Sequence, residues 1–432
     1  MELKMDNQQP EKMPPLAPVG LVPTKEDIEK LILLAAHDTA HDTAVKVFTA
    51  VTQYAYRARA SDIHFEPEEK LAIIRIRIDG ILHDLFQLPP VLHKQIVAVL
   101  KLMTHMRTDE HRAPQDGRYS FLTSDGEVDV RASVIAVTNG EKIVLRLLSS
   151  TSHSLGLEEL GFSEQDLLRV QRAIRRPWGM ILSTGPTGSG KTTSIYAILE
   201  ILNTREVNIA TIEDPVEYDI EGVNQSQVDP AAKLTFAAGL RSIVRQDPDI
   251  IMVGEIRDEE TASIAVNAAL TGHKLLSTIH TNNSASTILR LLDMNVEPFL
   301  ISSTLICAIA QRLVRRVCDD CHKVKELSRE EVVKILGESL AGELINGKTT
   351  VAVAEVVGCA TCNDTGYKGR IGIYEVLENT KTIQKLIIDH TDADTIEQAA
   401  IKEGMTTIAQ DGVRKIRLQL TTLEELVRVM SE

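Results

Sequence analysis

The spacing of hydrophobic positions divides the chain into segments of different structure. Between residue 25 and about residue 59, apolar residues recur at helical intervals, which predicts two helices or one helix with a break. Farther on they form short runs separated by Asp79-Gly80, Asp125-Gly126 and Asn139-Gly140, dipeptides that favour tight hairpin turns. The predicted strands cover residues 63–65, 71–78, 81–86, 119–122, 128–137 and 143–147. This pattern indicates a small α/β domain that ends near residue 150.

After this domain the pattern changes to strands that alternate with helices. Residues 149–154 are polar and predict a linker, and the alternation that follows predicts a mainly parallel sheet with helices on both faces. The first strand of this sheet, over residues 179–184, leads into a glycine-rich loop and then a helix to about Leu202. At the other end of the chain, residues 1–24 carry five prolines among polar residues, which predicts a flexible tail.

The glycine-rich loop has the composition of a phosphate-binding site. The segment Gly185-Pro186-Thr187-Gly188-Ser189-Gly190-Lys191-Thr192 fits the pattern G-x-x-x-x-G-K-[ST], in the required setting between a strand and a helix. Its glycines allow positive φ angles and let backbone N–H groups and the helix N-terminus approach phosphate closely. Lys191 adds a full positive charge, and the hydroxyl of Thr192 can ligate Mg²⁺. We therefore expect a nucleoside triphosphate and Mg²⁺ here, rather than a turn without function.

Two acidic residues follow later strands and are expected near the same loop. The strand over 208–212 ends in Glu213, and the strand over 250–253 is followed by Gly254 and Glu255. Because ligands of open α/β sheets collect at the carboxyl ends of the strands, both carboxylates should face the triphosphate. Asp249 precedes the second of these strands and would lie at its opposite end, about 13 Å from the phosphates. We therefore assign it a structural role.

A histidine ends a further predicted strand beside the loop. His280 follows the apolar run over residues 275–279. At most positions a lone histidine belongs to the core or the surface, but at a strand end next to a phosphate site one N–H group can sense the γ-phosphate. His280 is therefore a candidate site residue.

Composition narrows the class of protein. The chain has 432 residues, 43% of them hydrophobic and 25% charged, with a net charge of -14, which predicts a globular multidomain protein. The acidic balance and the 3% content of aromatic residues argue against nucleic acid as a partner. No apolar run approaches the roughly 20 residues that span a bilayer, and residues 1–22 lack a secretory signal pattern. We expect a cytoplasmic protein.

Four of the five cysteines form two C-x-x-C pairs. These are Cys318 with Cys321 and Cys359 with Cys362, separated by valine-rich, helix-like sequence. Four thiolates can close a tetrahedral site that has no open position, which favours a structural Zn²⁺ over free thiols or a redox pair. Cys307 is left over as an expected core residue.

These segments together resemble the ATPase family that powers type II secretion and type IV pilus assembly. The resemblance rests on the phosphate loop GPTGSGKTT, the acidic box TIEDPVEY, the segment LRSIVRQDPDIIMVGEIRD and the histidine box TGHKLLSTIHTN. Upstream, ASDIHFEP, RIRIDG, APQDGR and GEKIVLRLL are similar to the second N-terminal domain of that family. The likeness covers about residue 45 to the C-terminus. The two cysteine pairs are similar to those of its assembly and export members, which pilus-retraction ATPases typically lack.

The resemblance implies a RecA-like domain that hydrolyses ATP, with a role for each matched residue. Residues 185–193, ending in Thr193, would bind ATP, with Lys191 on phosphate and Thr192 on Mg²⁺. Glu255 would be the catalytic glutamate and Glu213 would orient the attacking water. His280 would report the γ-phosphate.

The resemblance also implies that arginines of the small domain act as fingers on the nucleotide. Arg75 and Arg77 alternate onto one face of a predicted strand. Without the resemblance to this family, we would interpret the two arginines as part of an exposed polar strand face. Arg131 lies in a segment with altered neighbours and is a weaker candidate for the same role.

The domain organisation and partners follow from the same reading. We expect a tail over 1–24, an N-terminal α/β domain over 25–150, a RecA-like ATPase domain over 151–315, a tetracysteine zinc module over 316–370 and a helical region over 371–432. The implied protein is a homohexameric motor. It would associate peripherally with the inner membrane through a platform protein, and a cytoplasmic protein that recruits it is a further candidate partner.

Two functions of other classes stay open at this point. One is a nucleic-acid translocase built on the same ATPase core, and the other is a nucleotide-gated scaffold that binds ATP without hydrolysing it. The combination of Lys191, Thr192 and Glu255 favours hydrolysis.

Overall fold

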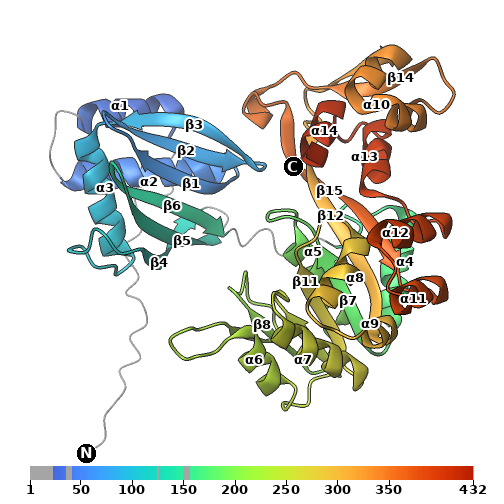
Figure 1. The fold of residues 1–432 in the computed structure, drawn as a ribbon. Coiled ribbons are helices and arrows are strands. Elements are labelled where there is room, and N and C mark those ends of the chain that lie inside the picture. Colours follow the sequence, from blue (N-terminus) through green and yellow to red (C-terminus); the bar gives the residue numbers. More distant parts are fainter. Residues whose placement is uncertain (1–22, 36–40, 124–125, 149–155, 432) are drawn as a thin grey trace, which may run out of the picture. The chain divides into compact units, whose positions relative to one another are not determined.

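The computed structural model describes residues 23–35, 41–123, 126–148 and 156–431, which form two compact units divided between His153 and Ser154 (Figure 1). The predicted linker over 149–154 lies outside the described residues, as does the predicted tail except for its last two residues. Within the described ranges, no helix combines the length and hydrophobicity needed to cross a lipid bilayer.

The first unit is a six-stranded antiparallel sheet with three helices packed on one face (Figure 1). Its strand order is β3-β2-β1-β6-β5-β4, and a strand is present at each of the six predicted places. Alternate residues such as Ile63 and Phe65 of β1 join the helices in one core, as the period of two predicts. The strands are β1 (Ala60–Pro67), β2 (Ala72–Ile78), β3 (Ile81–Leu88), β4 (Gln115–Thr123), β5 (Gly126–Val137) and β6 (Gly140–Leu148), and the helices are α1 (Lys25–Ala35), α2 (His41–Arg57) and α3 (Pro90–Met103).

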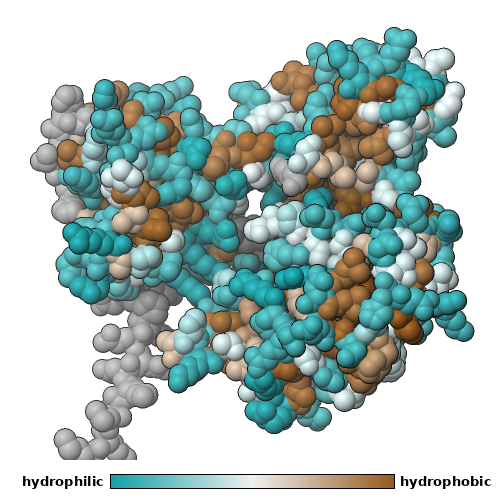
Figure 2. Space-filling model, in the orientation of Figure 1, coloured by the Kyte–Doolittle hydropathy of each residue, from teal (hydrophilic) through white to brown (hydrophobic). Residues whose placement is uncertain are grey.

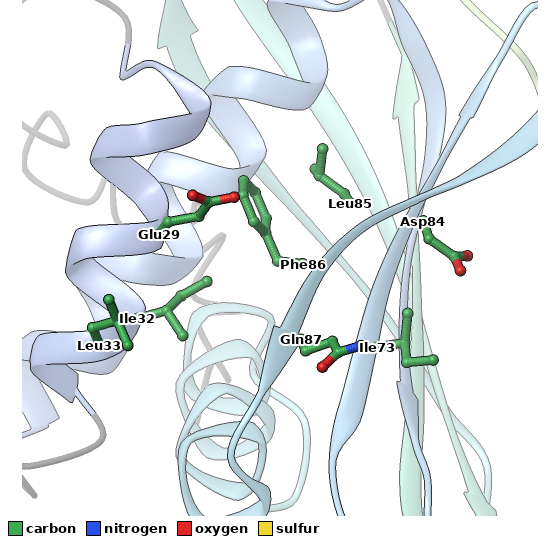
Figure 3. Close-up of a pocket in the computed structure, with 8 residues that line it drawn as sticks. All are labelled: Glu29, Ile32, Leu33, Ile73, Asp84, Leu85, Phe86 and Gln87. Carbon is green, nitrogen blue, oxygen red and sulfur yellow. The ribbon is translucent and has the colours of Figure 1, made fainter.

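A groove of about 440 Å³ lies in the first unit between α1 and the edge strand β3 (Figure 3). It has apolar walls and a partly acidic rim, and none of the predicted site residues lines it. The lining residues are Glu29, Ile32 and Leu33 of α1, Ile73 of β2, and Asp84, Leu85, Phe86 and Gln87 of β3.

The second unit is built on a seven-stranded sheet with the order β15-β12-β7-β11-β10-β8-β9. All neighbouring pairs are parallel except β12 with β15, which confirms the predicted mainly parallel sheet. The strands are β7 (Gly179–Thr184), β8 (Ile209–Glu213), β9 (Asn224–Gln227), β10 (Ile250–Val253), β11 (Lys274–Ile279), β12 (Leu305–Val317) and β15 (Tyr367–Glu378).

Alternate residues of these strands point to opposite faces of the sheet and pack into two separate hydrophobic cores, one on each face. Ile181 and Ile209 pack with α4 (Glu164–Arg175) and α5 (Lys191–Leu202). Met180 and Ile212 point the other way and pack with a larger set of helices. That set comprises α6 (Phe236–Ile243), α7 (Glu259–Leu270), α8 (Ser284–Asp293), α9 (Pro298–Thr304), α11 (Lys381–Ile388) and α12 (Ala393–Lys402).

The segment between the two cysteine pairs is only partly helical. It contains α10 (Arg329–Ile345), but the expectation of helix-like structure is wrong on either side, where β13 (Lys323–Ser328) pairs with β14 (Thr350–Glu355). In β14, Val351 and Val353 are buried at alternate positions, as in a strand with one buried face, and β-branched residues favour this structure. The helices α13 (Ile408–Arg417) and α14 (Leu423–Ser431) complete the same core.

The visible surface is mainly hydrophilic, with apolar patches on both units (Figure 2). This matches the ordinary proportion of charged and hydrophobic residues in the chain.

Candidate nucleotide and metal sites

The phosphate loop has a backbone that only glycine accepts at several positions. Gly188 and Gly190 have φ angles of 80° and 85°, in the left-handed region that side chains rarely adopt. At Gly185 a Cβ atom would lie 2.5 Å from the carbonyl oxygen of Gln311, so a larger residue would be excluded by contact as well. After this turn, α5 begins at Lys191, which leaves its first N–H groups directed toward the loop.

The lysine of the loop is buried beneath it. Lys191 Nζ donates hydrogen bonds of 2.9 Å to the carbonyl oxygens of Gly185 and Pro186. Burial lowers the pKa of Lys191 to about 8, because desolvation disfavours the ammonium form more than the nearby carboxylate of Glu255 favours it. An anion in the loop would supply the negative charge that this ammonium group needs.

The parallel register brings three predicted site residues to one edge of the sheet. Thr184, the last residue of β7, pairs with Ile279 of β11, so His280 follows at the level of the loop. Val253 of β10 pairs with Ser277 of β11 and with Ile212 of β8, which places the acids that follow β8 and β10 at the same edge. Asp249 lies at the opposite end, where it accepts a 2.7 Å hydrogen bond from the N–H of Asn208, in agreement with its predicted structural role.

Glu255 lies among cations at this edge. One carboxylate oxygen is ion-paired with Arg257, and the other lies 3.5 Å from Nε2 of His280. The Glu255 side chain is only 12% exposed, and its charge acts on Lys191. Burial, followed by the charge of Lys191, lowers the pKa of His280, so the ring is neutral at pH 7 and one nitrogen can donate while the other accepts. Lys191, Glu255 and His280 therefore form one electrostatic group.

Glu213 reaches the same edge but belongs to a different hydrogen-bonded group. Its carboxylate accepts hydrogen bonds from the hydroxyl groups of Tyr196 and Thr211 and, at 3.2 Å, from the amide of Gln225. The residue is 2% exposed. The backbone of Glu213 also abuts Gly254, where a Cβ atom would lie 3.2 Å from the Cα atom of Glu213. Both predicted acids thus lie inside the protein, with Glu255 nearer the charges of the loop.

The predicted arginine fingers lie in the first unit. In β2, Arg75 and Arg77 point away from the core residues Ile74 and Ile76, as their alternation predicts. Arg75 forms an ion pair of 3.0 Å with Glu66, and Arg77 forms one of 3.4 Å with Asp62. Arg131 of β5 pairs with Arg146 of β6 in the same sheet. Their action on a nucleotide stays a prediction.

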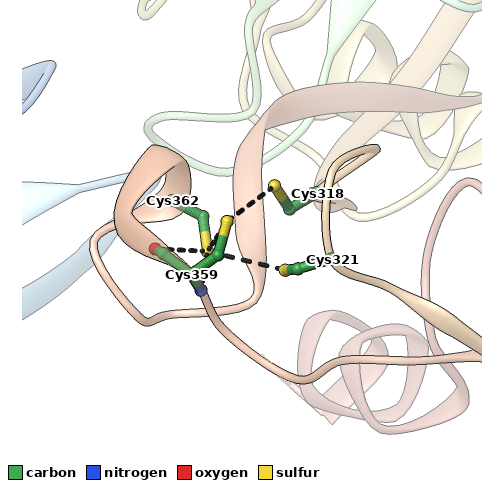
Figure 4. A group of neighbouring side chains, drawn as sticks. All are labelled: Cys318, Cys321, Cys359 and Cys362. Carbon is green, nitrogen blue, oxygen red and sulfur yellow. Dashed lines mark hydrogen bonds between the residues drawn. The ribbon is translucent and has the colours of Figure 1, made fainter.

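The four predicted metal ligands meet at one point (Figure 4). The sulfur atoms of Cys318, Cys321, Cys359 and Cys362 all lie within 4.8 Å of one another, and neighbouring pairs are 3.8 to 3.9 Å apart. A disulfide would need about 2.05 Å, whereas a tetrahedron of sulfurs at about 2.3 Å from zinc has edges of about 3.8 Å. Backbone N–H groups of Cys359 and Gly366 also donate to the sulfur of Cys362 at 3.2 Å. The spacing and donor set therefore fit a tetrahedral zinc site.

Residues 37–428 match the protein family described as Type II/IV secretion system protein. The chain belongs to this family. Among curated relatives, the type IV pilus assembly ATPase PilB of Myxococcus xanthus (strain DK1622) is 45% identical over 406 residues, which cover 94% of this chain and 70% of the relative. The type II secretion system ATPase E of Vibrio cholerae serotype O1 is 43% identical over 411 residues, or 95% of this chain and 78% of the relative.

Solved structures of an ATPase and of a pilus retraction motor share the fold. The Legionella pneumophila ATPase DotB has a TM-score of 0.64 at 21% identity, covering 89% of this chain and 95% of that chain. The pilus retraction motor PilT with bound ADP has a TM-score of 0.58 at 26% identity, covering 88% of this chain and 95% of that chain. The expected fold class and the expected family are both confirmed.

Several residues that shape the site in this family member escaped sequence reasoning. Gln311 of β12 is fully buried, donates a 2.7 Å hydrogen bond to the carbonyl oxygen of Ser189, and accepts one from Ser183. Arg312 donates to the carbonyl oxygen of Asn282 and acts electrostatically on Lys191. The polar pair Gln311-Arg312 inside an apolar strand was the signal that could have marked this position.

Proposed function

We propose that this protein is a Mg²⁺-dependent ATPase that acts as a homohexameric motor for assembly of type IV pili or type II secretion pseudopili. The observation that carries the proposal is the 45% identity over 94% of the chain to a type IV pilus assembly ATPase, together with the grouping of Lys191, Glu255 and His280 at the phosphate loop. Relatives named for type II secretion are almost as similar, so both machines are included.

Each site residue has a defined task in this proposal. The N–H groups of residues 185–193 and the ammonium group of Lys191 bind the phosphates, and the hydroxyl of Thr192 ligates Mg²⁺, which supplies charge neutralisation on the phosphates when bound. Glu255 accepts a proton from the attacking water, and Glu213 supports the water site. His280 donates its ring N–H toward the γ-phosphate.

The remaining parts would turn hydrolysis into movement. Arg75 and Arg77 approach the nucleotide as fingers, so that the first unit responds to the γ-phosphate. The four cysteines hold a structural zinc ion. The motor acts on an inner-membrane platform protein and is therefore located in the cytoplasm at the membrane surface. A cytoplasmic protein that recruits it to the membrane is a further proposed partner.

Mg²⁺-dependent phosphate release from ATP tests the proposal. We expect Lys191→Ala to abolish nucleotide binding, and Glu255→Gln to bind ATP with hydrolysis reduced by a factor of about 100 or more, because only the second variant keeps the phosphate contacts. Sedimentation with ATP should show a hexamer. A Glu255→Gln variant that hydrolyses ATP as fast as the parent would contradict the assignment of the base, and hydrolysis that depends on added DNA would favour a translocase.

A further inference from the structure

Arg257 contacts the proposed catalytic base from outside the phosphate loop. Its guanidinium group is ion-paired with one oxygen of Glu255, and the other oxygen faces His280. The Arg257 side chain is 60% exposed, whereas that of Glu255 is 12% exposed. A largely exposed cation is thus paired with a carboxylate that lies inside the site.

The backbone on both sides of Arg257 is held in place. The N–H of the buried residue Ile256 donates a 2.9 Å hydrogen bond to the carbonyl oxygen of Thr278, which ties the segment to β11. Asp258 caps α7 by accepting a 2.8 Å hydrogen bond from the N–H of Thr261. Since the main chain is anchored at both neighbours, replacing the side chain of Arg257 should leave the fold of this segment unchanged.

The charges around Glu255 come from four other elements. They are Lys191 at the start of α5, His280 after β11, Asp214 after β8, and Arg312 of β12, which acts on Lys191. The hydrogen bond with Glu255 raises the pKa of Arg257, and the charge of Asp214 adds to this effect. Arg257 is therefore in contact with the acid that follows β10 and is also within the electrostatic influence of the acidic box that follows β8.

We infer that Arg257 is a positioning residue, which fixes the carboxylate of Glu255 opposite His280. This inference rests on the proposed role of Glu255 as the base. Among the described residues, Arg257 forms no hydrogen bond or ion pair with the phosphate loop, so its effect on the reaction passes through Glu255. A guanidinium group that pairs with one oxygen of a carboxylate limits the rotation of that carboxylate, so its removal leaves the base less well oriented.

The test compares Arg257→Gln with Arg257→Lys in the full-length protein. We expect Arg257→Gln to lower kcat for ATP by roughly 10- to 100-fold, the range of one charge-assisted hydrogen bond, with KM changed by less than about twofold. Arg257→Lys should recover part of kcat, since it restores the charge without the planar guanidinium group.

Arg172→Gln provides a matched control. Arg172 is 57% exposed and forms a 2.7 Å ion pair with Glu378. Glu378 of β15 pairs with Cys307, which lies in the half of β12 that is distant from the phosphate loop. This variant loses the same kind of ion pair and should keep the kcat and KM of the parent. A folded Arg257→Gln variant with the parent's kcat would overturn the inference.

Glu255→Gln separates this inference from the proposed function. If Glu255→Gln hydrolyses ATP at the parent's rate, the base itself is misassigned and both ideas fail. If Glu255→Gln is inactive while Arg257→Gln behaves like the parent, only the positioning role of Arg257 fails. If Arg257→Gln does not fold, Arg257→Met replaces it, because methionine also removes the charge and keeps an unbranched side chain. A folded Arg257→Met variant with the parent's kcat would overturn the inference, and a kcat lowered as expected for Arg257→Gln would support it.

Discussion

Lys191 shows how burial changes the chemistry of a single residue in the phosphate loop. In the free loop its ammonium group is satisfied by two backbone carbonyl oxygens, and burial brings its pKa to about 8. A lysine in water would stay charged to above pH 10. The charge that binds phosphate is therefore lost within two pH units of neutrality.

We predict that ATP binding weakens between pH 7 and pH 9. Phosphate requires the protonated lysine, whose pKa in the free protein is about 8, so affinity is retained below this value and falls as pH rises through it. The last phosphate proton dissociates near pH 6 and does not contribute in this range. Titration of the ATP dissociation constant against pH measures the effect.

Lys191→Arg is the control for this pH dependence. A guanidinium group stays charged above pH 12, so the variant should show a flat profile from pH 7 to pH 9 at whatever affinity it retains. Equal slopes for the parent and for Lys191→Arg would mean that Lys191 is not the titrating group.

The two acids show what local sequence can and cannot supply. The strand ends predicted correctly that Glu213 and Glu255 reach the same edge of the sheet. Their side-chain environments differ because Tyr196 comes from α5 and Gln225 from β9, whereas His280 follows β11. These partners lie up to 25 residues from their acid and depend on the order of strands, so hydrophobic periodicity carries no information on them.

At the scale of elements, β12 connects the phosphate loop to the cysteine cluster. Gln311 in the middle of β12 donates a hydrogen bond to the backbone of Ser189 in the loop, and Cys318 directly follows the last residue of β12. The antiparallel partner β15 begins with Tyr367, which pairs with Val317 at the end of β12. The cysteine pair that precedes β15 therefore lies next to the cysteine pair that follows β12. The spacing of the cysteines predicted a site, and the pairing of β12 with β15 is what closes it.

We predict that the purified protein contains about one zinc ion per chain. Cys318→Ser and Cys359→Ser should each lose most of this zinc and unfold at a temperature lower by about 5 °C or more, because a structural site contributes its binding energy to folding. Elemental analysis and thermal denaturation measure the two effects.

Cys307→Ala is the matched control for the zinc site. Cys307 is fully buried in the core beside Ile181, and burial raises the pKa of its thiol, so it behaves as an apolar core residue. The variant should keep its full zinc content even if it is somewhat less stable. A parent protein without zinc, whose cysteines are linked as disulfides, would contradict the assignment.

At the scale of the whole molecule, the predicted active-site residues are divided between the two units. Arg75 and Arg77 belong to the first unit, and Lys191, Glu255 and His280 belong to the second. Hairpin dipeptides predicted the strands of the first unit, and the phosphate-loop pattern predicted β7 of the second. Neither pattern predicts which folded units contact each other, because such contacts depend on complementary surfaces and not on the hydrophobic period of a single helix or strand.

We predict that two inactive variants regain activity when they are mixed. We add to the proposed hexamer the assignment that Arg75 of one subunit acts on the nucleotide of its neighbour, so Arg75→Gln and Lys191→Ala should each be nearly inactive alone. In randomly mixed rings, about one interface in four combines an intact arginine with an intact loop, so ATP hydrolysis should return to about a quarter of the parent rate. If Arg75 serves the loop of its own subunit, no mixed ring contains an intact site and the mixture stays inactive. Mixing Lys191→Ala with Glu255→Gln gives the control, because both variants damage the same unit's site and should not restore hydrolysis.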